Sequence, residues 1–353
     1  MFGLRLMSKK AFELKLARLE SLREHGATQA TTEALRQALQ DRNNYVVAKA
    51  ARIAADLGLT ALIPELTAAF DRFFADPVKS DPQCWAKHGI SKALIPCLAQ
   101  HKHGISKALA DLGCEEAGVF LRALTYVQPE PVWGGSEDTA GPLRATCAAG
   151  LVQCRDISGP EILSNLTEVL VDRDKAVRMS AADAISRLGR PEGGLLLRFK
   201  ALSGDQEPEV LGACFSALLS LEGPRSIAFV ARFLDAAGDA GSEAALALGL
   251  TRDPEAFQAL KRKWESESGA QLAPTLLLAM ALTRHTEAIE LLLELVRGAS
   301  PYAEAAIEAL ASAHLTPEIR SLTEAAVQRN RNPRLRAAFD RHFGSSSGGT
   351  SAG

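Results

Sequence analysis

Prolines recur at nearly constant intervals along the second half of the chain, and this period constrains the fold more than any other feature. Pro160, Pro191, Pro224, Pro254 and Pro317 are separated by 31, 33, 30 and 63 residues, so the last interval is about twice the others. Proline is tolerated in the first turn of a helix, where its missing N–H has no partner within the helix. The sequence therefore predicts a repeat of about 31 residues in which each proline opens a helix.

Each repeat is expected to contain two helices joined by a polar turn. In the clearest unit, from Pro160 to Gly189, the apolar residues are Ile162, Leu163, Leu166, Val169 and Leu170 in the first helix, and Val177, Ala181, Ala184, Ile185 and Leu188 in the second. Spacings of three and four residues place each set on one helical face. Ser158 and Glu161 predict a capping box, and Asp253 and Thr316 predict simple helix caps.

The second half of this unit carries a family resemblance. The stretch from Asp174 to Gly189, DKAVRMSAADAISRLG, resembles the second half of a HEAT repeat at its Asp, Val-Arg, Ala-Ala and Leu-Gly positions. Residues 41–58 are similar, with Val47 where the family pattern has Arg. The resemblance implies an α-solenoid of antiparallel helix pairs. Bacterial HEAT-like proteins of this kind are often grouped with the repeats of phycobilisome lyases, a likeness of scaffold and not of chemistry.

Composition favours the same all-α class. Ala and Leu, which have low helix cost, far outnumber Val and Ile, which strands enrich. One helix pair cannot bury both its faces, so successive pairs are expected to stack around a continuous core. We predict an α-solenoid, a right-handed superhelix of about nine or ten stacked antiparallel helix pairs.

The chain is expected to have three segments. Residues 1–29 contain an amphipathic capping helix, residues 30–343 form the HEAT-like solenoid, and residues 344–353 form a disordered Gly/Ser tail. No apolar run reaches the roughly 18 to 20 residues of a membrane helix, and the N-terminus lacks the apolar core of a secretory signal. Most of the six cysteines lie among Ala and Leu, as is typical of reduced, packed thiols. A cytoplasmic location is therefore expected.

Residues 84–114 contain an internal duplication that should interrupt the regular pairing. The octamer KHGISKAL occurs at 87–94 and again at 102–109. The segment also gathers potential zinc ligands, namely Cys84, His88, Cys97, His101 and His103. Four-residue spacing would place each Cys–His pair on one helical face. The favoured alternative is that duplication doubled a histidine and that the cysteines are small packed residues, because no C-x-x-C pair is present. No metal and no cofactor is predicted.

Residues 128–139, QPEPVWGGSEDT, form the longest non-helical stretch of the repeat region, since two prolines forbid regular helix and two glycines free the backbone. Trp133, with acidic neighbours, could belong to a recognition loop, because functional residues concentrate on loops. In the favoured alternative, Trp133 folds back into the groove between two repeat units while Asp138 or Thr139 caps the next helix.

The leading functional hypothesis is a non-catalytic protein-interaction scaffold or adaptor. Stacked helix pairs create an extended concave face that suits another polypeptide, and the second helices usually line it. The candidate partner-binding residues are basic side chains on such helices together with the loop tryptophan, namely Lys49, Arg52, Arg178, Arg187 and Trp133. No catalytic residue is assigned, because the known nucleophile, phosphate-binding and metalloprotease motifs do not occur.

Two alternatives stay open. The resemblance implies the possibility of a bilin-lyase-type enzyme that acts on a partner protein. A DNA-binding HEAT-like protein is less favoured, because a formal net charge of −2 does not provide a basic footprint for nucleic acid. Residues 1–25 and 317–343 each carry six Lys or Arg against three Asp or Glu, whereas the middle of the chain is acidic. The sequence argues against nucleic-acid and membrane partners.

Overall fold

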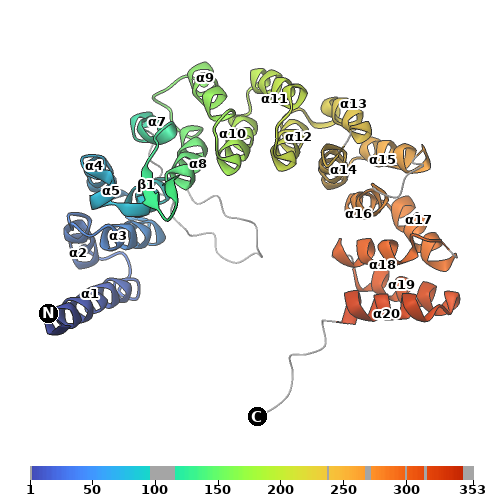
Figure 1. Ribbon diagram of the computed structural model, residues 1–353, viewed down its shortest axis with the longest axis horizontal. Coiled ribbons are helices and arrows are strands. Elements are labelled where there is room, and N and C mark those ends of the chain that lie inside the picture. Colours follow the sequence, from blue (N-terminus) through green and yellow to red (C-terminus); the bar gives the residue numbers. More distant parts are fainter. Residues whose placement is uncertain are drawn as a thin grey trace, which may run out of the picture. The chain divides into compact units, whose positions relative to one another are not determined.

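The computed structural model describes residues 2–95, 116–236, 238–266, 272–298, 300–313 and 316–344, with the backbone alone for residues 2–9 and 11. In this part of the chain every regular element is a helix apart from one two-stranded hairpin (Figure 1). The predicted all-α class is confirmed. The chain divides into two compact units, Met1–Leu188 and Gly189–Gly353, which we call unit 1 and unit 2.

The elements of unit 1 are, in chain order, α1 (Phe2–Ser21), α2 (Gln29–Leu39), α3 (Asn44–Asp56), η1 (Thr60–Leu62), α4 (Ile63–Arg72), α5 (Pro77–Ser80), η2 (Pro82–Cys84), α6 (Trp85–Leu94), α7 (Ala117–Leu124), β1 (Pro129–Val132), β2 (Gly135–Asp138), α8 (Gly141–Leu151), α9 (Gly159–Val169) and α10 (Lys175–Leu188), where η denotes a 3-10 helix.

Unit 1 has two layers of helices with its apolar core between them. Helices α3, α6, α8 and α10 form one row, in which each helix packs against the next. The other layer consists of α2, α4, α7 and α9, which pack on α3, α6, α8 and α10 in that order (Figure 1). The row is closely packed, because a Cβ atom at Gly89 of α6 would lie 2.9 Å from the Cβ atom of Ala48 in α3. The N-terminal helix α1 packs against α3.

The elements of unit 2 are α11 (Pro191–Ser203), α12 (Pro208–Glu222), η3 (Gly223–Ser226), α13 (Ile227–Ala231), η4 (Arg232–Asp235), α14 (Ala240–Thr251), α15 (Pro254–Ser266), α16 (Ala273–Thr283), α17 (Thr286–Arg297), α18 (Ala303–Ser312), α19 (Pro317–Asn330) and α20 (Pro333–Phe343).

Unit 2 repeats the two-layer arrangement with greater regularity. Helices α12, α14, α16, α18 and α20 form the row, and α11, α13, α15, α17 and α19 lie against it. Small residues let neighbouring helices of the row approach closely. A Cβ atom at Gly249 in α14 would lie 2.4 Å from the carbonyl oxygen of Ala279 in α16. Because backbone cannot yield as a flexible side chain can, glycine is required at this contact.

The proline period identifies helix starts correctly. Pro160, Pro191, Pro254 and Pro317 lie in the first turns of α9, α11, α15 and α19, and Pro224 lies in η3, directly before α13. Every apolar residue predicted to face the core from α9 is buried, and so are those predicted for α10 except the half-buried last residue, Leu188.

The predicted caps are confirmed at two sites and wrong at one. Ser158 and Glu161 form the capping box of α9. Asp253 Oδ1 accepts a hydrogen bond of 2.8 Å from the Glu255 N–H at the start of α15. Thr316 occupies the N-cap position of α19, but its side chain makes no capping hydrogen bond to the helix.

The first copy of the duplicated octamer forms α6, which sits in the regular row between α3 and α8. Residues 96–115, which include the second copy, lie outside the described residues, as do residues 345–353 of the expected tail. The helix predicted within residues 1–29 corresponds to α1, which covers Phe2–Ser21. Among the described residues no helix is both long and apolar enough to cross a bilayer.

Candidate functional site

A β-hairpin projects from unit 1 between α7 and α8. Strands β1 and β2 pair antiparallel, with Pro129 opposite Asp138 and Val132 opposite Gly135, so that Trp133 and Gly134 make a two-residue turn. Gly134 has φ +90°, a conformation that glycine adopts without the cost that a side chain adds. The sequence identified this stretch as non-helical but did not predict its strands.

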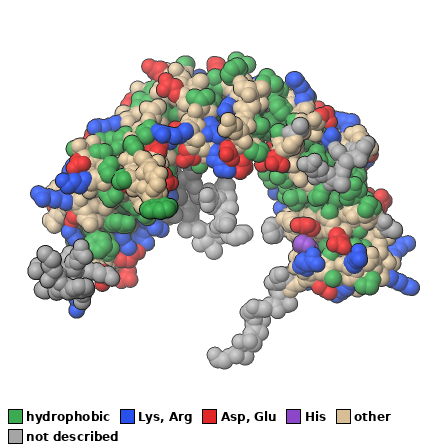
Figure 2. Space-filling model, in the orientation of Figure 1, with side chains coloured by type: hydrophobic (Ala, Val, Ile, Leu, Met, Phe, Trp, Pro, Cys, Tyr) green, Lys and Arg blue, Asp and Glu red, His purple; other side chains and the backbone are tan. Residues whose placement is uncertain are grey.

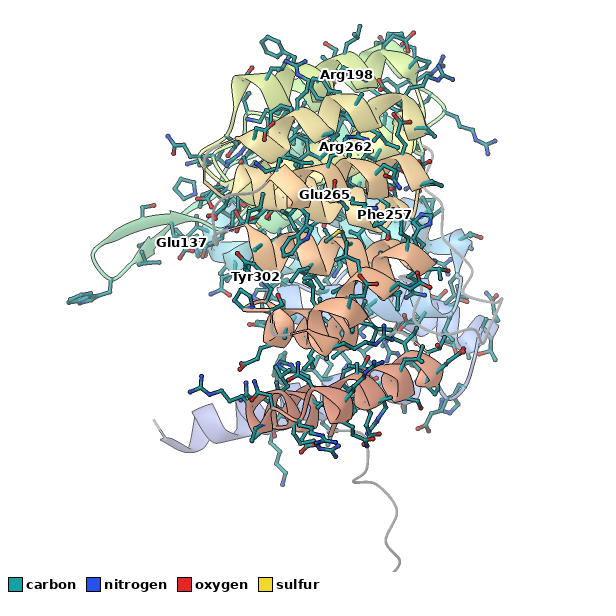
Figure 3. All side chains as sticks on the ribbon, turned by 90° about the vertical axis from the view of Figure 1, so that its right-hand side faces the viewer. Glu137, Arg198, Phe257, Arg262, Glu265 and Tyr302 are labelled. Carbon is teal, nitrogen blue, oxygen red and sulfur yellow. The ribbon has the colours of Figure 1, made fainter. Side chains whose placement is uncertain are left out.

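The tip of the hairpin is in solvent. Residues 131–137 are all exposed, and the exposed fraction of Trp133 is 103%. Figure 3 shows the hairpin, marked by Glu137, pointing away from the helices. The favoured expectation that Trp133 folds back between two repeat units is therefore wrong. The physical reason is strand pairing, since four residues at about 3.3 Å each carry the turn about 13 Å beyond the hairpin base.

The expected helix cap is also absent at the hairpin's end. The N-cap position of α8 is held by Ala140, with no side-chain hydrogen bond to the helix. Asp138 closes the hairpin base instead, since its Oδ1 accepts hydrogen bonds from the Gln128 N–H at 2.9 Å and the Ala140 N–H at 3.1 Å. The main-chain N–H of Thr139 donates to the Gln128 carbonyl at 3.1 Å, which extends the strand pairing by one step.

A buried carboxylate anchors the base of the hairpin. Glu130 is 9% exposed, and its Oε1 accepts hydrogen bonds from the Gln83 N–H at 2.5 Å, Gln128 Nε2 at 2.6 Å and Thr139 Oγ1 at 2.8 Å. Gln128 Nε2 also donates to the carbonyl of Asp81 at 2.9 Å. These bonds tie β1 and the start of α8 to the turn that precedes α6. Charge-assisted hydrogen bonds of this kind are stronger than neutral ones.

A fully buried ion pair lies beneath this anchor. Lys87 Nζ is 3.0 Å from Asp81 Oδ2, and neither side chain is exposed. Asp81 also accepts hydrogen bonds from the main-chain N–H groups of Ala86 and Lys87 and from Asn44 Nδ2. It thereby caps α6, where a negative charge is favourable. Lys87 Nζ donates to the Phe73 carbonyl at 3.3 Å, so the pair is well satisfied for buried charges.

The turn between Asp81 and α6 is strained. Gln83 and Cys84 have φ values of 58° and 54°, a region that residues with side chains rarely enter. Each such residue costs about 1 to 3 kcal/mol and persists only where its surroundings hold it. Here the hairpin supplies the restraint, because Glu130 binds the Gln83 N–H and Gln128 Oε1 accepts from Cys84 Sγ at 3.2 Å.

Arg144 of α8 connects the hairpin to the next helix pair. Its side chain is 1% exposed and binds Asp172 through two parallel hydrogen bonds of 2.7 and 2.9 Å. It also donates to Asp138 Oδ2 at 2.7 Å and to the Tyr126 carbonyl at 2.9 Å. Asp172 lies in the turn between α9 and α10. The buried polar groups thus form a continuous chain from α3 to α10.

Hydrogen-bond partners favour the ionised forms of Glu130 and Asp138. Although burial opposes it, the hydrogen bonds from Gln128, Thr139 and the Gln83 N–H hold the pKa of Glu130 below its ordinary value. In Asp138 burial is likewise outweighed by hydrogen bonds, including that from Arg144, and the pKa is lowered. Glu130 and Asp138 are therefore ionised at neutral pH, and their hydrogen-bond partners hold them in place.

The candidate zinc ligands are only partly within the described residues. Cys97, His101 and His103 lie outside them. Cys84 precedes α6 in a left-handed conformation, so it does not share a helical face with His88 as the spacing suggested. Burial raises the pKa of the Cys84 thiol to about 11 and lowers the pKa of His88. Among the described residues, no three His, Cys, Asp or Glu side chains are grouped so that they could hold a metal ion.

The basic candidates differ in their availability. The side chain of Arg178 is largely buried, and its Nη1 donates to the carbonyls of Asp172 and Arg173, so little of it is available to a partner. Arg187 donates to the Ala149 carbonyl at 3.1 Å and is only partly exposed. Lys49 pairs with Glu20 of α1 at 2.5 Å.

Arg52 is the most open of the basic candidates, on the solvent side of α3. Its charge helps to lower the pKa of Glu20, after the larger effect of the Lys49 hydrogen bond. On the face displayed in Figure 2, Lys and Arg side chains are interspersed with Asp and Glu in each unit. That mixture does not resemble the basic stripe of a nucleic-acid-binding surface.

Unit 2 offers two apolar surfaces. The exposed side of α11 carries Leu195, Phe199 and Leu202, which follow one another at helical spacing. A cleft of about 290 Å³ lies between the C-terminal ends of α12 and α14, beside the exposed Leu250. Neither surface brings charged groups together in a way that indicates a ligand.

Sequence reasoning missed the side chains that position the hairpin, namely Asp81, Lys87, Gln128, Glu130 and Arg144. Lys87 and Asp81 are six residues apart and belong to no motif, and Arg144 finds its carboxylates in two different turns. The one available signal was the pair of prolines around Glu130, since prolines at alternate positions are compatible with an edge strand.

Comparisons with known proteins give no family. No protein-family model matches the chain, and a search of curated proteins finds no match. Among solved structures, the crystal structure of an engineered protein is similar at 15% identity over 93% of this chain and 94% of that one, with a TM-score of 0.32. A chain from the computational design of self-assembling cyclic homo-oligomers is 17% identical over 94% and 98%, with a TM-score of 0.13. TM-scores this low do not establish a shared fold.

Proposed function

We propose that the chain is a non-catalytic protein-interaction scaffold, built from HEAT-like helix pairs that stack as an α-solenoid, and that the hairpin of unit 1 contacts the partner. The observation that carries the proposal is a fully exposed tryptophan on an element whose base is held by buried charges. Tryptophan is enriched among residues that dominate binding energy. A preformed hairpin also avoids the entropy cost of ordering a loop on binding.

The scaffold proposal rests on the alternating contacts within each unit, where one layer of helices covers a continuous row. A stack of this kind offers a large surface and buries its own core without a partner. Its placement in the cytoplasm stays a prediction from sequence.

The buried thiols Cys84, Cys147 and Cys214 give no support to a cysteine nucleophile. Burial raises the pKa of Cys147 well above its usual range and that of Cys214 to about 12, as it does for Cys84. These thiols are protonated at neutral pH and do not act as nucleophiles. No observation favours the bilin-lyase or DNA-binding alternatives.

The hairpin is a better candidate for the partner contact than most of the basic residues, because their side chains are already engaged. Arg178 and Arg187 are engaged by main-chain carbonyls, and Lys49 by Glu20. Among the described residues, neither Trp133 nor Arg52 has a side-chain hydrogen bond or ion pair that competes with a partner, and Trp133 is fully exposed. Arg52 is kept as the alternative contact.

The test is capture of a partner by the immobilised chain, followed by titration of the purified partner with variants. Trp133→Ala should abolish or strongly weaken binding. Phe199→Ala is the matched control, because Phe199 is an aromatic residue 73% exposed on α11 of unit 2. Undiminished affinity in Trp133→Ala would contradict the proposal, and loss of binding in Arg52→Glu alone would move the contact to α3.

A further inference from the structure

The two edges of the hairpin differ in their main-chain hydrogen bonding. In antiparallel pairs, residues that exchange hydrogen bonds alternate with residues whose N–H and C=O groups point outward. The bond from the Thr139 N–H to the Gln128 carbonyl marks their pair as hydrogen-bonded. Because the two kinds of pair alternate along the register, the Glu130–Glu137 and Val132–Gly135 pairs are also hydrogen-bonded within the hairpin. Residues 129, 131, 136 and 138 present their main-chain groups outward.

The outer edge of β1 is closed to a further strand. Its two outward positions are Pro129 and Pro131, which have no N–H to donate. Natural proteins use proline in this way to prevent edge-to-edge pairing. Prolines at these two positions also leave the bonds within the hairpin intact, which explains why β1 tolerates them.

The outer edge of β2 is open. Ser136 lies opposite Pro131 and is exposed, and the alternation along the register turns its main-chain N–H and C=O groups away from β1. Its N–H and C=O are therefore available to an added strand, as in β-augmentation. Gly135, next to it, leaves open space where a side chain would stand. The outer edge of β1 therefore cannot donate main-chain hydrogen bonds to an added strand, whereas the outer edge of β2 can.

The charges beside this edge indicate what the added strand carries. Glu130 and Glu137 are cross-strand neighbours, but Glu130 is engaged by the buried anchor while Glu137 is exposed. Among the described residues Glu137 forms no ion pair, so a basic side chain placed beside it would be favourable. A side chain placed beside Gly135, two positions away on the same face, would reach the exposed Val132.

A second copy of the chain fits this edge less well. If two β2 strands paired antiparallel about Ser136, the two Glu137 side chains would become diagonal neighbours on one face. Diagonal neighbours in a sheet are within reach of long side chains, and like charges there oppose pairing. The geometry favours a foreign strand with a positive charge.

We propose that the outer edge of β2 binds an extended segment of a partner protein as a third strand, with a Lys or Arg beside Glu137 and a large apolar residue two positions away against Val132. This inference rests on the proposed function and specifies the chemistry of its partner. Main-chain hydrogen bonds to Ser136 supply affinity, and the two side chains supply specificity.

The experiment selects short linear peptides from a displayed random library with the immobilised full chain. We expect the selected peptides to share a basic and a large apolar residue two positions apart. Ser136→Pro removes the outward N–H, and should weaken a selected peptide by up to about tenfold, since one hydrogen bond is worth up to about 1.5 kcal/mol. Pro131→Ser, the matched change on the blocked edge, should leave affinity within about twofold.

Charge reversal provides a second test that does not depend on proline. Glu137→Lys should turn the preference from basic to acidic peptides with an unchanged melting temperature. Selected peptides that bind Ser136→Pro and wild type equally would overturn the inference. If those peptides still lose affinity in Trp133→Ala, the proposed function stands without it. The inference would also be overturned if the chain dimerised in a concentration-dependent manner and Ser136→Pro abolished the dimer. In that case a second copy of the chain would occupy the β2 edge.

Discussion

The hairpin region of unit 1 and the helix row of unit 2 are held together by different interactions. Around the hairpin, buried charges such as Arg144 and Lys87 find carboxylates far away in sequence. In the row of unit 2, apolar and small residues pack helix against helix, as at Gly249. The first region depends on hydrogen-bond geometry, and the second on close packing.

A repeated helix stack and a projecting hairpin need different stabilising interactions. Apolar packing is non-directional and suits a repeated helix pair. A hairpin that leaves the helical layers has almost no apolar surface to bury, so directional interactions must hold it. Breaking one partner of a buried charge pair is more costly than small changes in an apolar row.

The largest effect is expected from Arg144→Met. It leaves Asp138 and Asp172 without their buried counter-charge, and should destabilise unit 1 by about 3 to 5 kcal/mol. Urea denaturation can be followed by fluorescence in a Trp264→Phe background, where Trp85 and Trp133 report on unit 1.

Arg173→Met is the matched control for this prediction. Arg173 also approaches Asp138, at 3.4 Å, but its side chain is 60% exposed. The loss should be no more than about 1 kcal/mol. Equal effects of the two substitutions would show that burial of the charge does not matter.

A smaller effect is expected in the helix row of unit 2. Gly249→Ala places a methyl group against the backbone of Ala279 and should cost about 1 to 3 kcal/mol. Gly118→Ala in α7 meets nothing within 4 Å and should be neutral or stabilising by up to about 1 kcal/mol. Calorimetric melting of both variants measures the contrast, which disappears if the row is loosely packed.

Acidification should affect the two regions with opposite signs. The pKa values of Glu130 and Asp138 are lowered in the folded state, so their contribution to stability is present above the ordinary values of 4.5 and 3.8 and is lost as pH falls through the folded values. In unit 2, burial and the charges of Glu209 and Asp239 raise the pKa of Glu243. Its protonation therefore adds stability as pH falls from neutrality towards 4.5.

Stability measured from neutral pH downward distinguishes these contributions. Glu130→Gln should reduce the acid sensitivity of unit 1, and Glu243→Gln should remove the gain in unit 2. If both variants follow the wild-type pH profile, these carboxyl groups do not govern the difference between the regions.

The smallest effect on stability is expected from Trp133→Ala. Because its side chain is fully exposed, the change in unfolding free energy should stay within about 0.5 kcal/mol. Acrylamide quenching of tryptophan fluorescence should fall in the variant, since the most accessible ring is gone. A loss of more than about 1 kcal/mol would indicate that Trp133 packs against the protein.

The helices were predictable from sequence because local rules specify them. Proline at helix starts, the Ser158–Glu161 capping box and the stripe from Val177 to Ile185 each act within a few residues. The hairpin anchor was not predictable, because Asp81 meets Lys87 and Gln128 only through tertiary contacts. The exposure of Trp133 was misjudged because hydrophobicity alone favours burial, whereas strand register fixed its position.

If unit 1 presents a preformed hairpin with one free edge, amide hydrogen exchange measured residue by residue will distinguish the two edges of β2. The Thr139 N–H donates within the hairpin, and should exchange at least about a hundredfold more slowly than the outward N–H of Ser136. Ser136 should exchange at nearly the rate of an unstructured peptide. Equally fast exchange at both positions would contradict a preformed hairpin, and equally slow exchange would contradict the free edge.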